Sequence, residues 1–241
     1  MKNPLPSRAE QNLEAQIRVA SRLKELSTSR EHAPKPFITI SRQFGCEAVA
    51  LAEYLAPQLD SCEKLDTGSW QVYSRRLIEA MADQQYSYDQ LMSALDSRAR
   101  TAIEDFFDTI FGQISDLRLL HKLVSTMRAT ASLGHCIIVG RGGAIVTHDL
   151  PGGLHIRLVA PEEYRLRGLM ERRGWSVEEA LRHMREQDMA RRSFYQKYLH
   201  RDSNEQEIYD LILNTARLTQ VEMAEQVVSL FRSRLTKFTN R

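Results

Sequence analysis

The sequence has no apolar run of eighteen residues, few cysteines and almost no net charge. Without such a run the chain has no candidate membrane-spanning helix, and charged side chains between positions 8 and 22 interrupt the apolar centre that a signal peptide needs. We therefore expect a cytoplasmic protein without membrane contact. The three cysteines, Cys46, Cys62 and Cys136, have no metal-ligand spacing, and an odd count leaves one outside any disulfide scheme.

A net charge of +2, from 33 basic and 31 acidic side chains, gives no general attraction to nucleic acid. The basic segments also lack the aromatic residues that stack on bases, so we expect no nucleic-acid partner. The seven histidines show no ligand spacing, and we expect no metal site made by the protein alone. At 241 residues, the chain can bury one sizeable core.

Four short apolar, β-branched runs alternate with helical patterns, which predicts an α/β fold with a largely parallel sheet. They start at Phe37, Cys136, Leu154 and Tyr209, and a weaker fifth strand is expected at 61–66. Helices are predicted at 47–58, 74–83, 87–99, 101–133, 161–173, 176–200 and 217–236.

Two segments do not follow this alternation of strands and helices. Residues 1–36 form a helical appendage with apolar positions such as Leu13 and Ala20, which could cap the core, fray, or form a homodimer with a second copy. Residues 83–133 form a helical insertion. It either overhangs a site at the carboxyl ends of the strands or thickens one face of the domain.

The turn after the first strand, 43-QFGCEAVA, has the position of a phosphate-binding loop but only one of its glycines, Gly45. A second cluster, 139-VGRGGAIV, places Gly140 and Arg141 after another strand. Arg141 could bind a phosphate with two parallel hydrogen bonds or form a salt bridge to a neighbouring helix. Arg42, at the end of the first strand, is a further candidate for binding phosphate.

A third cluster lies on the predicted helix 176–200. Arg185, Asp188 and Arg192 share one face, and Arg191 lies three residues beyond Asp188. An aspartate between arginines can orient their guanidinium groups toward a phosphoryl group, although a solvated helix face would have the same pattern.

Together these blocks resemble the cytidylate kinase-like family of P-loop nucleoside monophosphate kinases. The resemblance runs from 38-ITISRQFG through 138-IVGRGG and 185-REQDMARRSFYQKY to 210-DLILNTARL, or roughly residues 37–233. It implies a P-loop NTPase-type five-stranded parallel sheet, with the insertion at 83–133 on the acceptor side and a helical lid at about 174–203. The domain would span residues 37–241.

The resemblance also implies roles for individual residues. Arg141 matches the arginine that faces the acceptor phosphate, whereas Arg185, Asp188 and Arg191 match the catalytic lid. Gly140, Arg42, Gly45 and Arg192 are then further phosphate or acceptor contacts. The implied reaction is phosphoryl transfer from ATP, with Mg²⁺, to a CMP-like nucleoside monophosphate.

The phosphate loop departs from the family pattern. Glu47 and Ala48 replace loop glycines, and Val49 and Ala50 supply no hydroxyl for magnesium. A carboxylate about 4 Å from a phosphate charge costs roughly 1 kcal/mol in water and more in a partly dry site. Two functions therefore stay open: a nucleotide kinase, or a degenerate kinase fold that binds a nucleotide or another phosphorylated small molecule without turnover.

Overall fold

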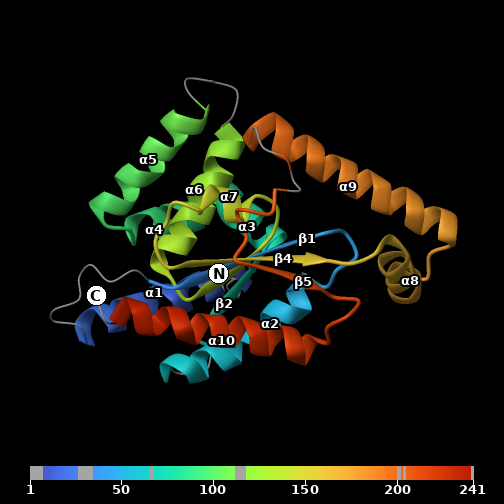
Figure 1. Ribbon diagram of the computed structural model, residues 1–241. Coiled ribbons are helices and arrows are strands. Elements are labelled where there is room, and N and C mark those ends of the chain that lie inside the picture. The colour runs from blue at the N-terminus through green and yellow to red at the C-terminus, as the bar shows by residue number, and fades with distance from the viewer. Residues whose placement is uncertain are drawn as a thin grey trace, which may run out of the picture.

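Five parallel strands form a single sheet in the order β2-β3-β1-β4-β5 (Figure 1). The computed structural model describes residues 8–26, 35–65, 68–111, 118–199, 202 and 205–239. The strands are β1 (Phe37–Arg42), β2 (Gln71–Ser74), β3 (Cys136–Val139), β4 (Gly153–Val159) and β5 (Leu211–Asn214). The predicted α/β fold and four of the five predicted strands are confirmed.

The strand predicted at 61–66 is wrong. Residues 61–63 are the end of α2 (Ala48–Glu63), and residues 66 and 67 lie outside the described part of the chain. The buried carboxylate of Asp60 explains the turn that follows, because it accepts hydrogen bonds from the N–H groups of Gly68 (2.7 Å) and Trp70 (2.9 Å). The fifth strand is β2 instead, at the edge of the sheet.

Helices cover both faces of the sheet (Figure 1). α2 and α10 pack together on one face, and α1 and the helices from α3 to α6 build the core on the other. The remaining bounds are α1 (Arg8–Leu26), α3 (Arg75–Asp83), α4 (Gln85–Ser93), α5 (Ser97–Phe111), α6 (Arg118–Leu133), α7 (Gly143–Val146), α8 (Glu162–Arg173), α9 (Val177–Leu199) and α10 (Gln220–Thr239).

Two predicted helix boundaries in the insertion differ from the structure. The helix predicted at 87–99 ends at Ser93, because the carboxylate of Asp96 accepts the N–H of Ala99 (2.8 Å) and starts α5 as a new helix. The helix predicted at 101–133 is divided into α5 and α6, and residues 112–117 between them lie outside the described residues.

The N-terminal helix α1 packs on the core. Leu13 is fully buried, and the buried amide of Gln16 donates to the carbonyls of Thr130 (2.8 Å) and Gly134 (2.6 Å). The hydroxyl of Tyr73 donates to the same amide at 2.7 Å. Each such buried hydrogen bond contributes about 1 kcal/mol, so α1 is fastened to β2 and α6 by polar contacts as well as by apolar packing.

The ends of α8 and α9 are set by local sequence signals. α8 has Glu162 in its first turn and ends at Gly174, whose left-handed backbone (φ +66°) stops the helix. α9 then begins with a capping box, in which the N–H of Glu179 donates to the Ser176 hydroxyl and the N–H of Ser176 donates to the Glu179 carboxylate. These ends fix the direction in which α9 leaves α8 at the right of Figure 1.

Candidate functional site

The loop that joins β1 to α2 is anchored to the end of β4. The N–H of Gln43 donates to the carbonyl of Leu158 (3.0 Å), and the side-chain oxygen of Gln43 accepts the N–H of Ala160 (2.9 Å). Gly45 follows with φ +96°, and a Cβ there would lie 3.1 Å from the Cβ of Arg165. A glycine is therefore required at this turn, both for its backbone and for the close approach of α8.

Three arginines from separate elements gather beside this loop at the carboxyl edge of the sheet. Arg42 ends β1, Arg141 follows β3, and Arg191 comes from α9. Burial, followed by the charges of Arg191 and Arg141, lowers the pKa of Arg42 from its ordinary 12.5 to about 10. Burial, followed by Arg191 and Arg75, lowers the pKa of Arg141 to about 10 as well.

The charge of this arginine cluster, Arg42, Arg141 and Arg191, is only partly balanced. Arg42 has one guanidinium nitrogen, Nη1, that is buried and has no hydrogen-bond partner within the described residues. Arg141 donates to the neutral amide of Gln187 on α9 (3.0 Å) rather than to a carboxylate. Since a buried cation is costly unless it is paired, the arrangement is suited to an anionic ligand.

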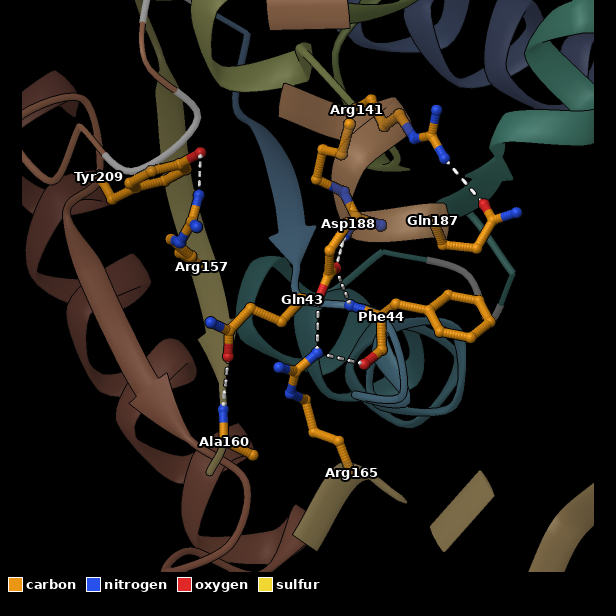
Figure 2. A network of polar contacts seen from close by, with 10 residues as sticks. Gln43, Phe44, Arg141, Arg157, Ala160, Arg165, Gln187, Asp188 and Tyr209 are labelled. Atoms are coloured by element: carbon orange, nitrogen blue, oxygen red, sulfur yellow. Dashed lines mark hydrogen bonds and ion pairs between the residues drawn. The ribbon is translucent and has the colours of Figure 1, made fainter. Parts of the chain in front are cut away.

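Neighbouring groups extend the polar surroundings of the cluster. Arg157 on β4 is 7% exposed and donates to the hydroxyl of Tyr209 at 3.3 Å (Figure 2). The N–H of Gly142 donates to the hydroxyl of Tyr195 on α9 (3.1 Å), and the N–H of Gly140 donates to the carbonyl of Ile40 (3.2 Å). The glycine turn after β3 is thereby held between β1 and α9.

Asp188 on α9 places its carboxylate on the loop itself. One oxygen accepts the backbone N–H of Phe44 (3.2 Å) and a guanidinium N–H of Arg191 (2.9 Å). The other oxygen accepts Nη1 of Arg165 (2.8 Å), which also donates to the carbonyl of Phe44 (3.0 Å). Figure 2 shows these contacts converging between α8, α9 and the loop.

Glu47 lies at the far end of the loop from Arg42, directly before α2. Its carboxylate pairs with Nε of Arg172 at 3.2 Å, and its side chain is 58% exposed. Arg172 also donates to the carbonyl of Gly45 (3.0 Å). Beside this pair lies a cavity of about 170 Å³, smaller than a typical ligand pocket. Its lining includes Gly45, Glu47, Tyr164, Arg172, Thr215 and Gln220.

Some of the predicted site residues on α9 lie on its buried face, toward the loop, and others lie on its exposed face. Met184 and Tyr195 are 1% exposed and Arg191 is 8% exposed, so Asp188 between them faces inward. Arg185 and Arg192 are exposed.

Sequence reasoning did not single out Phe44, Arg165 or Gln187. The available signal for Arg165 was its position in the first turn of α8. Because α8 begins just after the carboxyl end of β4, its first turn lies at the edge of the sheet where the site is.

The residues around the loop do not fit a magnesium ion. Val49 and Ala50 carry no oxygen on their side chains, and the carboxylate of Asp188 is already bonded to two guanidinium groups. Within the described ranges, no three His, Cys, Asp or Glu side chains gather into a metal-binding group. The same part of the chain contains no helix long and apolar enough to cross a bilayer.

The strand order and the helices on both faces of the sheet define an all-parallel α/β fold covered on both sides. The family model described as the cytidylate kinase-like family matches residues 37–217, and the chain belongs to this family.

Three individual proteins are similar to this chain at low identity, and one of them, a solved structure with a TM-score above 0.5, supports the fold. An uncharacterized protein from Eubacterium ventriosum ATCC 27560 superposes with a TM-score of 0.63 at 18% identity, covering 83% of this chain and 99% of the other. Shikimate kinase from Bacteroides thetaiotaomicron gives a TM-score of 0.43 at 10% identity, covering 83% of this chain and 98% of the other. A uronate isomerase from Corynebacterium glutamicum is 28% identical over 95 residues, which are 39% of this chain and only 18% of that protein.

Proposed function

We propose that this protein binds a phosphorylated small molecule, such as a nucleoside monophosphate, at the arginine cluster and does not transfer a phosphoryl group from ATP. The observation that carries this proposal is the buried, unpartnered Nη1 of Arg42 beside Arg141 and Arg191. A phosphate monoester would supply the acceptor oxygens and the negative charge that this cluster lacks within the described residues.

The loop gives the reason for expecting binding without turnover. A working phosphate loop presents several backbone N–H groups, a lysine and a hydroxyl to the phosphates and magnesium. Here the N–H of Phe44 is taken by Asp188, and the helix that follows begins with Glu47, Ala48 and Val49. The family implies ATP and Mg²⁺ in general, but these side chains do not provide the usual contacts for them.

Calorimetry with CMP, and with uncharged cytidine as its matched control, tests the proposal. We expect CMP to bind and cytidine to bind at least tenfold more weakly, because charge-assisted hydrogen bonds to the phosphate contribute about 1.5–3 kcal/mol each. Arg141→Gln should weaken CMP binding at least tenfold. Arg182→Gln, which removes an exposed arginine from the same lid helix as Arg191, should leave it unchanged. Equal affinity for CMP and cytidine, or full affinity in Arg141→Gln, would contradict the proposal.

A second candidate is nucleoside monophosphate kinase activity, which the cavity beside Gly45 favours. The cavity adjoins the loop on the side away from the arginine cluster, where a second, donor ligand would have to approach. A coupled assay for diphosphate formation with Mg-ATP and a panel of monophosphates distinguishes the two functions. Turnover that Arg141→Gln abolishes would establish the kinase; no turnover, together with CMP binding, is the result that we expect.

A further inference from the structure

The carboxylate of Asp188 has the contacts that a phosphate oxygen has in a nucleotide-binding loop. It accepts one backbone N–H from the loop, at Phe44, and it is held by guanidinium groups on two sides. Backbone N–H groups at a strand-to-helix turn, combined with arginines, are a recurrent way of binding phosphate. In this protein the anion at that position belongs to the chain itself.

Arg165 gives an independent sign that this place is built for an anion. Its residue exposure is 7%, and its Nε is buried without a hydrogen-bond partner among the described residues. One of its terminal nitrogens serves both Asp188 and the carbonyl of Phe44. The single carboxylate of Asp188 therefore leaves part of the Arg165 guanidinium group unsatisfied, and a phosphate with more oxygens could satisfy it.

We infer that Asp188 is an internal ligand that occupies a phosphate subsite formed by Phe44, Arg165 and Arg191, and that it blocks this subsite against polyphosphates. A polyphosphate can enter only after the carboxylate has left the loop. The inference rests on the proposed function, since Arg191 belongs both to this subsite and to the arginine cluster. It adds that the lid helix discriminates against triphosphates through Asp188.

The difference in exposure between the two carboxylates near the loop supports this assignment. The side chain of Asp188 is 22% exposed, whereas that of Glu47 is 58% exposed and faces Arg172. In the described part of the chain Asp188 contacts the N–H of Phe44, Arg165 and Arg191, whereas Glu47 pairs with Arg172, so Asp188 is the group that competes directly with an incoming anion.

Inorganic triphosphate without magnesium is the probe for this inference, with its affinity measured by calorimetry at fixed ionic strength. Asp188→Asn keeps the size of the side chain and removes its charge, and Asp188→Ala also empties the position. Glu186→Gln is the matched control, because it removes a carboxylate that is exposed on the same helix and pairs with His183 at 3.5 Å. Thermal unfolding of each variant shows that it is folded.

We expect triphosphate to bind at least tenfold more tightly to Asp188→Asn than to the wild type, and within twofold of the wild type to Glu186→Gln. Adding Arg165→Gln to Asp188→Asn should remove the gain, which places the bound triphosphate at the loop. If Asp188→Ala does not fold, the isosteric Asp188→Asn decides the outcome. Equal gains in Asp188→Asn and Glu186→Gln, or no gain in either, would overturn the inference.

Titration of CMP into the same proteins separates this result from the proposed function. Tight CMP binding to the wild type without a triphosphate gain in Asp188→Asn refutes the internal ligand and keeps the proposed function. A triphosphate gain in a protein that never binds CMP refutes the proposed function and keeps the internal ligand.

Discussion

Replacing Arg42 with methionine should make the free protein more stable while it removes anion binding. The guanidinium group of Arg42 is buried between other cations, and its Nη1 has no partner in the described part of the chain. Methionine retains much of the apolar stem and introduces no charge. If Arg42 serves ligand binding and not folding, its replacement should raise the stability of the free protein and lower its affinity for the ligand.

The size of the effect follows from the pKa of Arg42, which falls from 12.5 to about 10 in the folded protein. Each unit corresponds to about 1.4 kcal/mol, so the charged form is disfavoured in the folded state by about 3 kcal/mol. This cost is fully present at every pH below the folded pKa and is relieved only as the pH rises from about 10 toward 12.5. Allowing for lost contacts of the guanidinium group, we expect Arg42→Met to raise the free energy of unfolding at pH 7 by about 1–3 kcal/mol.

Urea denaturation at pH 7, with and without CMP, measures both sides of this prediction. CMP should raise the unfolding midpoint of the wild type and leave that of Arg42→Met unchanged, because a ligand stabilises only a protein that binds it. Arg182→Met, at an exposed position of α9, should alter the unfolding free energy by less than about 0.5 kcal/mol. If Arg42→Met is less stable than the wild type while Arg182→Met is unchanged, the unpaired cation is not a cost to the fold and the reasoning fails.

Two further predictions concern the sheet and the loop. Burial lowers the pKa of His155 from 6.5 to about 4, so the unfolded chain takes up a proton first, and stability should fall as the pH drops from 6.5 to 4. His155→Asn should remove about 3 kcal/mol of that fall, measured by urea unfolding across this pH range, while the exposed His148→Asn keeps it. Gly45→Ala should lower the free energy of unfolding by about 1–3 kcal/mol, because it combines a left-handed backbone with a 3.1 Å contact to Arg165. Gly174→Ala, at φ +66° in open space, should cost less, and equal losses in the two variants would show that the contact has no effect.

The sequence predicted the central strands because their buried residues form continuous β-branched runs. β2 has only two buried positions, Val72 and Tyr73, between polar ends, so it carried no comparable signal. The boundary between α4 and α5 was missed for a similar reason, since one capping carboxylate, Asp96, interrupts an otherwise continuous helical pattern. The edge strand β2 is set by its pairing with β3, which the local pattern does not contain. The Asp96 cap is a local signal, but the apolar spacing continues across it and conceals the boundary.

Positions at the ends of the strands predicted which residues meet at the candidate site better than the sequence motifs did. Arg42 ends β1 and Arg141 follows the neighbouring parallel strand β3, so their meeting at one edge of the sheet follows from the topology. Arg165 was one of many basic residues between positions 157 and 201, and only its place in the first turn of the helix after β4 distinguished it. The contact between Asp188 and Phe44 joins residues 144 positions apart, and no local feature of the sequence indicates it.

The position of Asp188 changes the explanation for the altered phosphate loop. On sequence grounds Glu47 was the carboxylate expected to repel a phosphate, but its side chain is exposed and paired with Arg172, so its charge is largely screened. Asp188 instead lies on the loop with two guanidinium groups and a backbone N–H. Glu47→Gly should therefore raise the affinity for inorganic triphosphate by less than Asp188→Asn does, as calorimetry would measure. If Glu47→Gly raised the affinity more than Asp188→Asn, Glu47 would be the group that prevents triphosphate from binding. The replacement of the loop glycines would then be sufficient to explain why the loop does not bind a phosphate donor.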